Sequence, residues 1–226
     1  GPGVPVATRG SGGRTTDDAV VRQLEEARGL GFLGPGPVAP HVEHALGFAA
    51  AAAALGSGTP PAWPGVVVDL GSGGGLPGLV LAGTWPGTAF VLVEASARRA
   101  AFLRRAVASC GWGDRVTVLE ERAEQVGRDP DRRGAADLVV ARSFGPPAVV
   151  AECAAPLLRV GGVLLVSEPP REDGESRWPG KPLGELGLGT SQEIRDGYGY
   201  RSMVQVRPCP DRYPRRVGVP AKRPLF

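Results

Sequence analysis

Residues 66–78 read VVVDLGSGGGLPG, and this stretch decides the fold. Three valines form an apolar, β-branched run that is typical of a buried strand, and Asp69 follows them. Glycines fill most of the next positions, and glycine is needed where a backbone turns sharply or approaches a ligand closely. Pro77 suits the first turn of a helix, whose start offers free N–H groups to an anionic group. The stretch therefore predicts a strand, a tight cofactor-binding turn and a helix.

Strands and helices alternate at short spacing after this turn. Strands are expected at 89–94, 116–120, 136–142 and 163–167, and helices at 96–109, 122–126 and 147–158. Residues 190–196 and 200–206 predict a closing antiparallel pair. Such alternation indicates parallel βαβ units with helices on both faces of one sheet, so ligands should gather at the carboxyl ends of the strands.

Composition and spacing divide the chain into four parts. The expected parts are a disordered N-terminus over 1–15, a helical cap over 16–60, a main domain over 61–206 and a basic tail over 207–226. Within the cap, helices are expected over 17–28 and 41–55. The opening Gly1-Pro2 resembles the scar left when a protease removes a tag. The polar, Pro/Gly-rich segment 168–189 is expected to be a mobile loop.

Charge and cysteine usage set broad limits on function. A net charge of +3 is too weak to demand a polyanionic partner, although the tail carries six cations against one acid. Three scattered cysteines and the absence of a long apolar segment favour a reduced, cytoplasmic protein without a membrane span. His41 and His44 are interpreted as ordinary helix residues, because no third ligand is spaced to complete a metal site.

The glycine turn allows two classes of cofactor. Residues 73–78 satisfy the spacing G-x-G-x-x-G of dinucleotide folds, but that spacing alone is weak evidence. Residues 69–75 also read Asp-x-Gly-x-Gly-x-Gly, the pattern of class I S-adenosylmethionine-dependent methyltransferases. Asp69 favours this second interpretation, because its negative charge would oppose a pyrophosphate. Glu94, at the end of the next strand, suits the ribose hydroxyls of either cofactor.

Several segments together resemble the glucose-inhibited division protein B family. They are DLGSGGGLPG (69–78), ARRAAFLRR (97–105), RAE (122–124), ARSFGPP (141–147), PLLRVGG (156–162) and RYPRRVGVPAKRPL (212–225). The resemblance implies a Rossmann-like class I methyltransferase fold, with a mostly parallel seven-stranded sheet and a small N-terminal helical cap. It further implies an S-adenosylmethionine-dependent enzyme that methylates N7 of a guanine in small-subunit ribosomal RNA.

The resemblance and the strand ends together assign the site residues. Those expected to bind the cofactor are Asp69, Gly71, Ser72, Gly73, Gly75, Leu76, Glu94, Ala95, Arg122, Ala123, Glu124 and Arg142. Those expected to contact RNA are Arg98, Arg99, Arg212, Tyr213, Arg215, Arg216, Lys222 and Arg223. Arg142 and Glu168 are expected at the reaction centre. Because guanine N7 carries a lone pair and no proton, the reaction needs alignment and not a general base.

Two departures from the family pattern leave other functions open. The family usually has Lys-Gly after the fifth strand, where this chain has Ser167-Glu168, so an anion replaces a cation beside the substrate. The N-terminal helices also lack the usual Arg-His-x-x-Asp-Ser pattern and retain at most His44. A diverged methyltransferase acting on a small molecule or peptide, or a non-catalytic RNA-binding paralogue, are therefore the alternatives.

Overall fold

The computed structural model describes residues 8–9, 15–55, 64–170 and 176–226. At its centre lies a seven-stranded sheet in the order β5-β4-β3-β6-β7-β9-β8. The strands are β3 (Val66–Leu70), β4 (Ala89–Val93), β5 (Val116–Leu119), β6 (Ala136–Ala141), β7 (Leu158–Glu168), β8 (Gln192–Asp196) and β9 (Tyr198–Val204). The first five of these are parallel, and β9 pairs antiparallel with both β7 and β8. The prediction of a mostly parallel seven-stranded sheet is confirmed.

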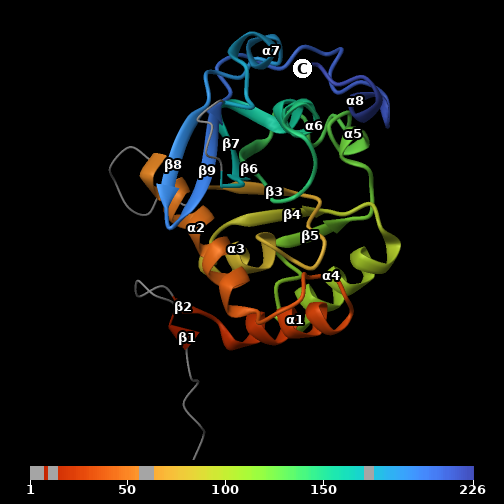
Figure 1. Cartoon of the computed structure of the whole chain (residues 1–226). Helices are drawn as coiled ribbons and strands as arrows, with labels where there is room; N and C mark the ends of the chain where they lie inside the picture. The colour runs from red at the N-terminus through yellow and green to blue at the C-terminus, as the bar shows by residue number, and fades with distance from the viewer. Residues whose placement is uncertain (1–7, 10–14, 56–63, 171–175) are drawn as a thin grey trace, which may run out of the picture.

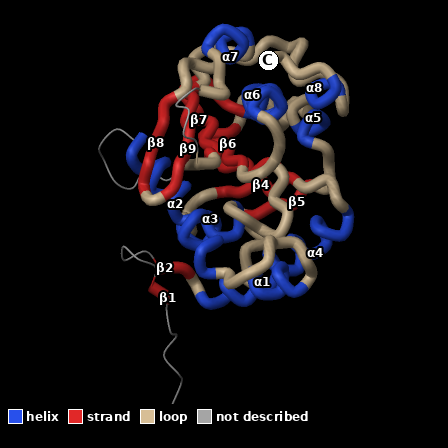
Figure 2. Tube along the Cα trace, viewed as in Figure 1, coloured by secondary structure: helices blue, strands red, loops and turns tan. Residues whose placement is uncertain are grey.

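Helices cover both faces of this sheet (Figures 1 and 2). One face carries α1 (Asp18–Gly29), α2 (Ala39–Leu55), α3 (Gly78–Thr84) and α4 (Ala97–Ser109). The other carries α5 (Ala123–Val126), α6 (Pro147–Ala154) and α7 (Gly180–Glu185), and the short α8 (Val219–Lys222) lies beside α5 and α6. Capping explains two of the starts, since Asp17 accepts a hydrogen bond from Ala19 N and Ser96 accepts one from Arg99 N.

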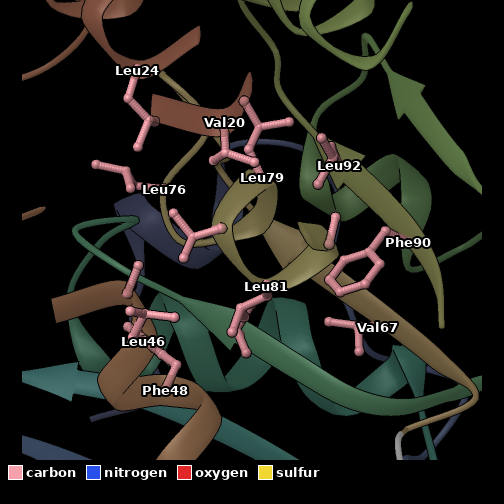
Figure 3. Packing of buried hydrophobic residues seen from close by; sticks show 14 of the residues in the cluster. Val20, Leu24, Leu46, Phe48, Val67, Leu76, Leu79, Leu81, Phe90 and Leu92 are labelled. Atoms are coloured by element: carbon pink, nitrogen blue, oxygen red, sulfur yellow. The ribbon is translucent and has the colours of Figure 1, made fainter. Parts of the chain in front are cut away.

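The N-terminal helices belong to the core of the sheet domain. Leu79 and Leu81 of α3 lie between side chains of α1 and α2 and those of the strands (Figure 3). Val20 of α1 and Phe48 of α2 are fully buried in the same cluster. Burial of each large apolar side chain stabilises the fold by about 1.5–3 kcal/mol. Residues expected to form a cap are therefore packed into the same core as the sheet.

The segment from 168 to 189 differs from the mobile loop that its composition predicts. Of its described residues, Gly180–Glu185 form α7, and Trp178 and Leu183 are buried against the second face of the sheet. Apolar burial orders this segment in spite of its prolines and glycines. Residues 171–175 lie outside the described residues.

Two other boundaries also differ. The helix expected over 147–158 ends at Ala154 and continues as a 3₁₀ turn over Ala155–Leu157, because Pro156 cannot donate a helical hydrogen bond. Strand β7 therefore starts earlier than expected. Within the range expected to be disordered, β1 (Thr8–Arg9) pairs with β2 (Thr15–Thr16), and the rest of 1–14 lies outside the described residues.

The described residues contain no helix that is both long and apolar enough to span a membrane. The thiols of Cys110, Cys153 and Cys209 are free.

Candidate functional site

The sheet order creates a crevice at the carboxyl ends of β3 and β6. The chain runs from β3 outward to β4 and β5, then returns to the other side of β3 as β6. Loops that leave two adjacent strands in opposite directions separate, and ligands bind in the gap. Three neighbouring cavities of about 250, 340 and 970 Å³ open here. Ser143, two residues after the end of β6, lines all three and has a φ of 54°.

The first cavity, of about 250 Å³, lies between the glycine turn and the segment that precedes α2. Gly71 to Gly74 form one wall, and Phe32 and Leu33 form the opposite one. A Cβ added to Gly74 would lie 2.6 Å from Leu33 Cδ2 and 2.9 Å from the Phe32 carbonyl oxygen. The N-terminal segment therefore lies directly on the turn, and this close approach requires glycine at position 74.

Asp69 lies beneath the turn and does not line these cavities. Its side chain is fully buried, and Oδ2 accepts a hydrogen bond of 2.9 Å from Gly78 N at the start of α3. Burial raises the pKa of this carboxyl to about 7. Asp69 therefore holds the turn against α3 through Oδ2, while Oδ1 is buried without a hydrogen-bond partner among the described residues, and its contact with the cofactor stays a prediction.

Glu94 joins the ends of two strands at the second cavity, of about 340 Å³. Oε2 accepts a hydrogen bond of 2.8 Å from Gly73 N, and Oε1 accepts one of 2.9 Å from Ser96 N. A carboxylate oxygen can accept two hydrogen bonds, so each oxygen retains acceptor capacity toward a ligand. Apolar and polar residues share this lining, among them Val93, Ala95, Arg122, Ala123, Glu124, Phe144, Pro146 and Val149.

The C-terminal tail forms part of the same cavity. Ala221 of α8 lines it, and Gly218 N donates a hydrogen bond of 3.0 Å to Oε1 of the buried Glu124. Arg122 Nε lies 3.7 Å from Oε2 of Glu124. The RAE segment (122–124), which is predicted to bind the cofactor, lines this cavity, and Glu124 also holds the tail in place.

Arg142 stands between the first cavity and the third, of about 970 Å³. Arg142 Nη2 lies 2.8 Å from His41 Nδ1, and because a guanidinium has only donors, the imidazole nitrogen accepts. Burial and the neighbouring guanidinium lower the pKa of His41, which favours the neutral ring that this hydrogen bond needs. Arg142 Nη1 is buried and has no hydrogen-bond partner among the described residues. A buried donor without a partner is unfavourable, so a ligand that reached this atom would satisfy it.

Glu168 lies in the wall of the third cavity with its carboxylate already engaged. Oε1 accepts hydrogen bonds from Arg177 Nη2 at 2.9 Å and from Trp178 Nε1 at 2.8 Å. Arg201 Nε lies 3.9 Å from Oε2. The carboxylate expected beside the reaction centre is therefore neutralised by two guanidinium groups.

The residues expected to contact RNA fall into two groups. Arg98 and Arg99 are exposed, with guanidinium groups 5.1 and 5.8 Å from the Phe32 ring, and Arg99 lines the first two cavities. In the tail, Arg212, Arg216, Lys222 and Arg223 are exposed.

Tyr213 and Arg215 differ from the expectation of an RNA contact. Tyr213 is buried in the second core cluster, and Arg215 pairs with the buried Glu152. These two side chains attach the tail to the fold, because each is occupied by contacts within the protein.

Several residues of the site were missed by sequence reasoning. His41 had been interpreted as an ordinary helix residue, and Ser143, Phe144, Arg177 and Arg201 had no assigned role. Ser143 and Phe144 directly follow Arg142 at a strand end, and this position was the available signal. Arg177 and Arg201 come from separate segments that only the folded chain brings together.

Several known proteins are similar to this chain in sequence. Residues 53–175 match the family model GidB, described as rRNA small subunit methyltransferase G. A protein of Prochlorococcus marinus named ribosomal RNA small subunit methyltransferase G is 41% identical over 165 residues, which cover 70% of this chain and 67% of that protein. The protein of that name from Symbiobacterium thermophilum is 38% identical and covers 81% of this chain and 78% of its own length.

Solved structures of lower identity share the fold. The O-methyltransferase TomG of Streptomyces achromogenes, solved in complex with SAM, superposes with a TM-score of 0.57 at 18% identity, covering 83% of this chain and 89% of TomG. The SAH-bound Podospora anserina methyltransferase PaMTH1 also has a TM-score of 0.57, at 16% identity, covering 88% of this chain and 89% of its own. The match to the family model and the identity to these relatives show that this chain belongs to the GidB family, rRNA small subunit methyltransferase G.

Proposed function

We propose that this protein transfers a methyl group from S-adenosylmethionine to N7 of a guanine in small-subunit ribosomal RNA. Membership of the GidB family makes it a methyltransferase with S-adenosylmethionine as methyl donor. The observation that carries the proposal is the run of three cavities that meet at Ser143, with Arg142 at their junction. The relatives' shared name supports ribosomal RNA as the acceptor.

The first two cavities fit the two halves of the cofactor. Arg99 offers a cation to the carboxylate of the methionine half, beside the turn from Gly71 to Gly74. Glu94 offers acceptor capacity to the ribose hydroxyls, and Phe144 and Val149 offer an apolar surface to the adenine. Bound here, the cofactor supplies an electrophilic methyl group on a sulfonium sulfur.

The third cavity would hold the acceptor base. Arg142 would turn its buried, unpartnered Nη1 donor toward guanine O6 or the adjacent phosphate, while His41 holds the guanidinium through Nη2. No proton leaves N7 on methylation, so the residues need only align the base and exclude water. Alignment of this kind can contribute about 7–11 kcal/mol to lowering a barrier.

Exposed cations around the site would hold the RNA backbone. Arg98 lies near the first cavity, and Arg212, Arg216, Lys222 and Arg223 lie along the tail. Contacts with phosphates release counterions, so binding should weaken as salt rises. We therefore also propose a cytoplasmic location, and the free thiols of Cys110, Cys153 and Cys209 support a reducing compartment.

Methyl transfer from tritiated S-adenosylmethionine tests the proposal. The acceptors are naked small-subunit rRNA, assembled small subunits and a small-molecule extract, and calorimetry measures cofactor binding separately. We expect label in RNA or subunits. Label only in the extract would instead favour a methyltransferase for small molecules, and a folded protein that binds no cofactor would favour a non-catalytic RNA-binding role.

A further inference from the structure

We propose that Arg177 and Arg201 bind a phosphate of the acceptor strand next to the target nucleotide, and that Glu168 positions them for it. The inference rests on the proposed function and adds to it an anion subsite at the far wall of the third cavity. Arg177 and Arg201 would touch the substrate, whereas Glu168 would act only through them.

The geometry brings three separate segments to one point. Glu168 ends β7, Arg201 lies on β9, and Arg177 lies shortly before α7. Oε1 of Glu168 accepts from Arg177 Nη2 and from the indole of the buried Trp178, so the carboxylate has a fixed orientation. Both guanidinium groups and the carboxylate line the third cavity.

Among the residues that the structure describes, the balance of charge at this wall is cationic. Arg142, Arg177, Arg195 and Arg201 line the cavity, and the described acidic residues in its lining are Glu168 and Glu193. Arg195 pairs with Glu193 at 2.7 Å, so these two neutralise each other. One carboxylate, Glu168, is then shared between Arg177 and Arg201, and the pair keeps an excess positive charge.

Donor capacity points in the same direction. Each guanidinium has five N–H donors. The hydrogen bonds found among the described residues take Arg177 Nη2 to Glu168 and Arg201 Nη1 to Ser191 Oγ at 3.3 Å. Arg201 Nε lies 3.9 Å from Glu168, beyond hydrogen-bond distance, and Nε of both arginines is buried, so the donors that remain for a ligand are on their Nη atoms. Planar guanidinium groups with unused donors match the oxygens of a phosphate, which a strand of RNA supplies beside every base.

The direction in which Glu168→Gln changes RNA binding distinguishes this proposal from simple repulsion between Glu168 and the RNA. If Glu168 merely opposed the RNA, Glu168→Gln would strengthen RNA binding by removing a negative charge. If Glu168 positions the two arginines, the same change lets them move, and the KM for small-subunit rRNA rises in spite of the added net positive charge. We expect a rise of about ten-fold with kcat little changed, the scale of one charged hydrogen bond.

Substitutions of the arginines test the subsite itself. Arg177→Gln and Arg201→Gln should each raise the KM for rRNA about ten-fold. RNA binding by each variant should also depend less steeply on salt: the slope of the logarithm of the binding constant against the logarithm of the salt concentration should fall by about the amount expected for one phosphate contact. Arg201→Lys keeps the charge without the planar fork and should recover part of the loss. The matched control is Arg22→Gln. Arg22 is an exposed arginine on α1, and it is not among the residues that line the three cavities.

Two further measurements keep the outcome decisive. Each variant is compared with the unsubstituted protein in thermal melting and in calorimetric binding of S-adenosylmethionine, so that loss of fold is detected. If the unsubstituted protein methylates rRNA and the folded Arg177 and Arg201 variants behave like Arg22→Gln, the subsite is refuted while the proposed function stands. If the unsubstituted protein methylates no RNA, the proposed function itself fails. Tighter RNA binding by Glu168→Gln would overturn the positioning role.

Discussion

Arg215 in the C-terminal tail and Glu152 on α6 form a two-pronged ion pair. Arg215 Nε donates to Oε1 at 2.9 Å and Nη2 donates to Oε2 at 2.7 Å. The carboxylate is fully buried, and the backbone N–H of Arg215 also donates to it at 2.8 Å. The tail therefore attaches to the helix layer that carries α5 and α6, along which it runs in Figure 1. The position of α8 beside the second cavity depends on this attachment.

Arg215→Met should destabilise the fold because it leaves Glu152 buried without its cation. Removal of one partner of a buried pair typically costs about 3–5 kcal/mol. Urea unfolding measures the loss, and the double variant Glu152→Leu with Arg215→Met should recover much of it. A folded Arg215→Met protein of normal stability that has lost only RNA binding would instead place Arg215 on the substrate.

Gly78→Ala should weaken both stability and cofactor binding. The added Cβ would lie 2.5 Å from Asp69 Oδ2 and 2.6 Å from Leu92 Cδ2, so the turn or β4 must shift. Overpacking of this kind typically costs about 1–3 kcal/mol. The control is Gly87→Ala, because nothing lies within 4 Å of a Cβ at that position. Equal melting temperatures for the two variants would show that the turn adapts.

The sheet, and the edge of it at which the cofactor residues lie, were predictable from the sequence because each depends on a pattern within one short stretch of residues. The apolar run at 66–68, the glycines after Asp69 and the acid at Glu94 each lie in one short stretch, and strand ends in a parallel sheet meet at one edge. The predicted strand 136–142 was observed as β6, with Arg142 directly after it.

Contacts between distant segments could not be predicted. Nothing in the tail sequence identifies Glu152 as the partner of Arg215, so its charge suggested RNA. In the segment expected to be a loop, Trp178 and Leu183 have no regular spacing, and their burial depends on the face of β7. His41 reaches Arg142 from a position 101 residues earlier.

Glu94→Gln should lower the affinity for S-adenosylmethionine. Whichever way the amide is turned, its NH₂ group faces the backbone N–H of Gly73 or Ser96, and one acceptor is lost. The amide also replaces the charged acceptor that Glu94 offers to the ribose hydroxyls, and loss of one charged hydrogen bond of about 1.5–3 kcal/mol is equivalent to about ten-fold or more in the dissociation constant. Calorimetry measures it, with Glu120→Gln as the exposed control. Unchanged affinity would exclude Glu94 from the cofactor site.

His44 should make the protein less stable in mild acid. Burial, then the charge of Arg142 and then His41, lowers the pKa of His44 to about 4. The unfolded chain takes up a proton near pH 6.5, about the ordinary value, whereas the folded chain does so only near 4. The stability that the neutral His44 contributes is therefore fully present above about pH 6.5, and it is lost as the pH falls from about 6.5 toward about 4.

The pH effect is measured by urea unfolding at about pH 7.5 and about pH 5. His44→Asn removes the titrating group, so its loss of stability between the two conditions should be smaller than that of the unsubstituted protein. Equal losses in the two proteins would mean that His44 is not a neutral, buried imidazole.

Nucleoside analysis of small-subunit rRNA after incubation with the protein and S-adenosylmethionine tests the central claim most directly. Mass spectrometry of the digested RNA should find N7-methylguanosine, which is absent when the protein is omitted. Its amount should fall sharply for Arg142→Gln, because Arg142 stands at the junction of the cofactor and acceptor cavities. RNA that gains no N7-methylguanosine, from a protein that binds S-adenosylmethionine normally, would contradict the proposed function.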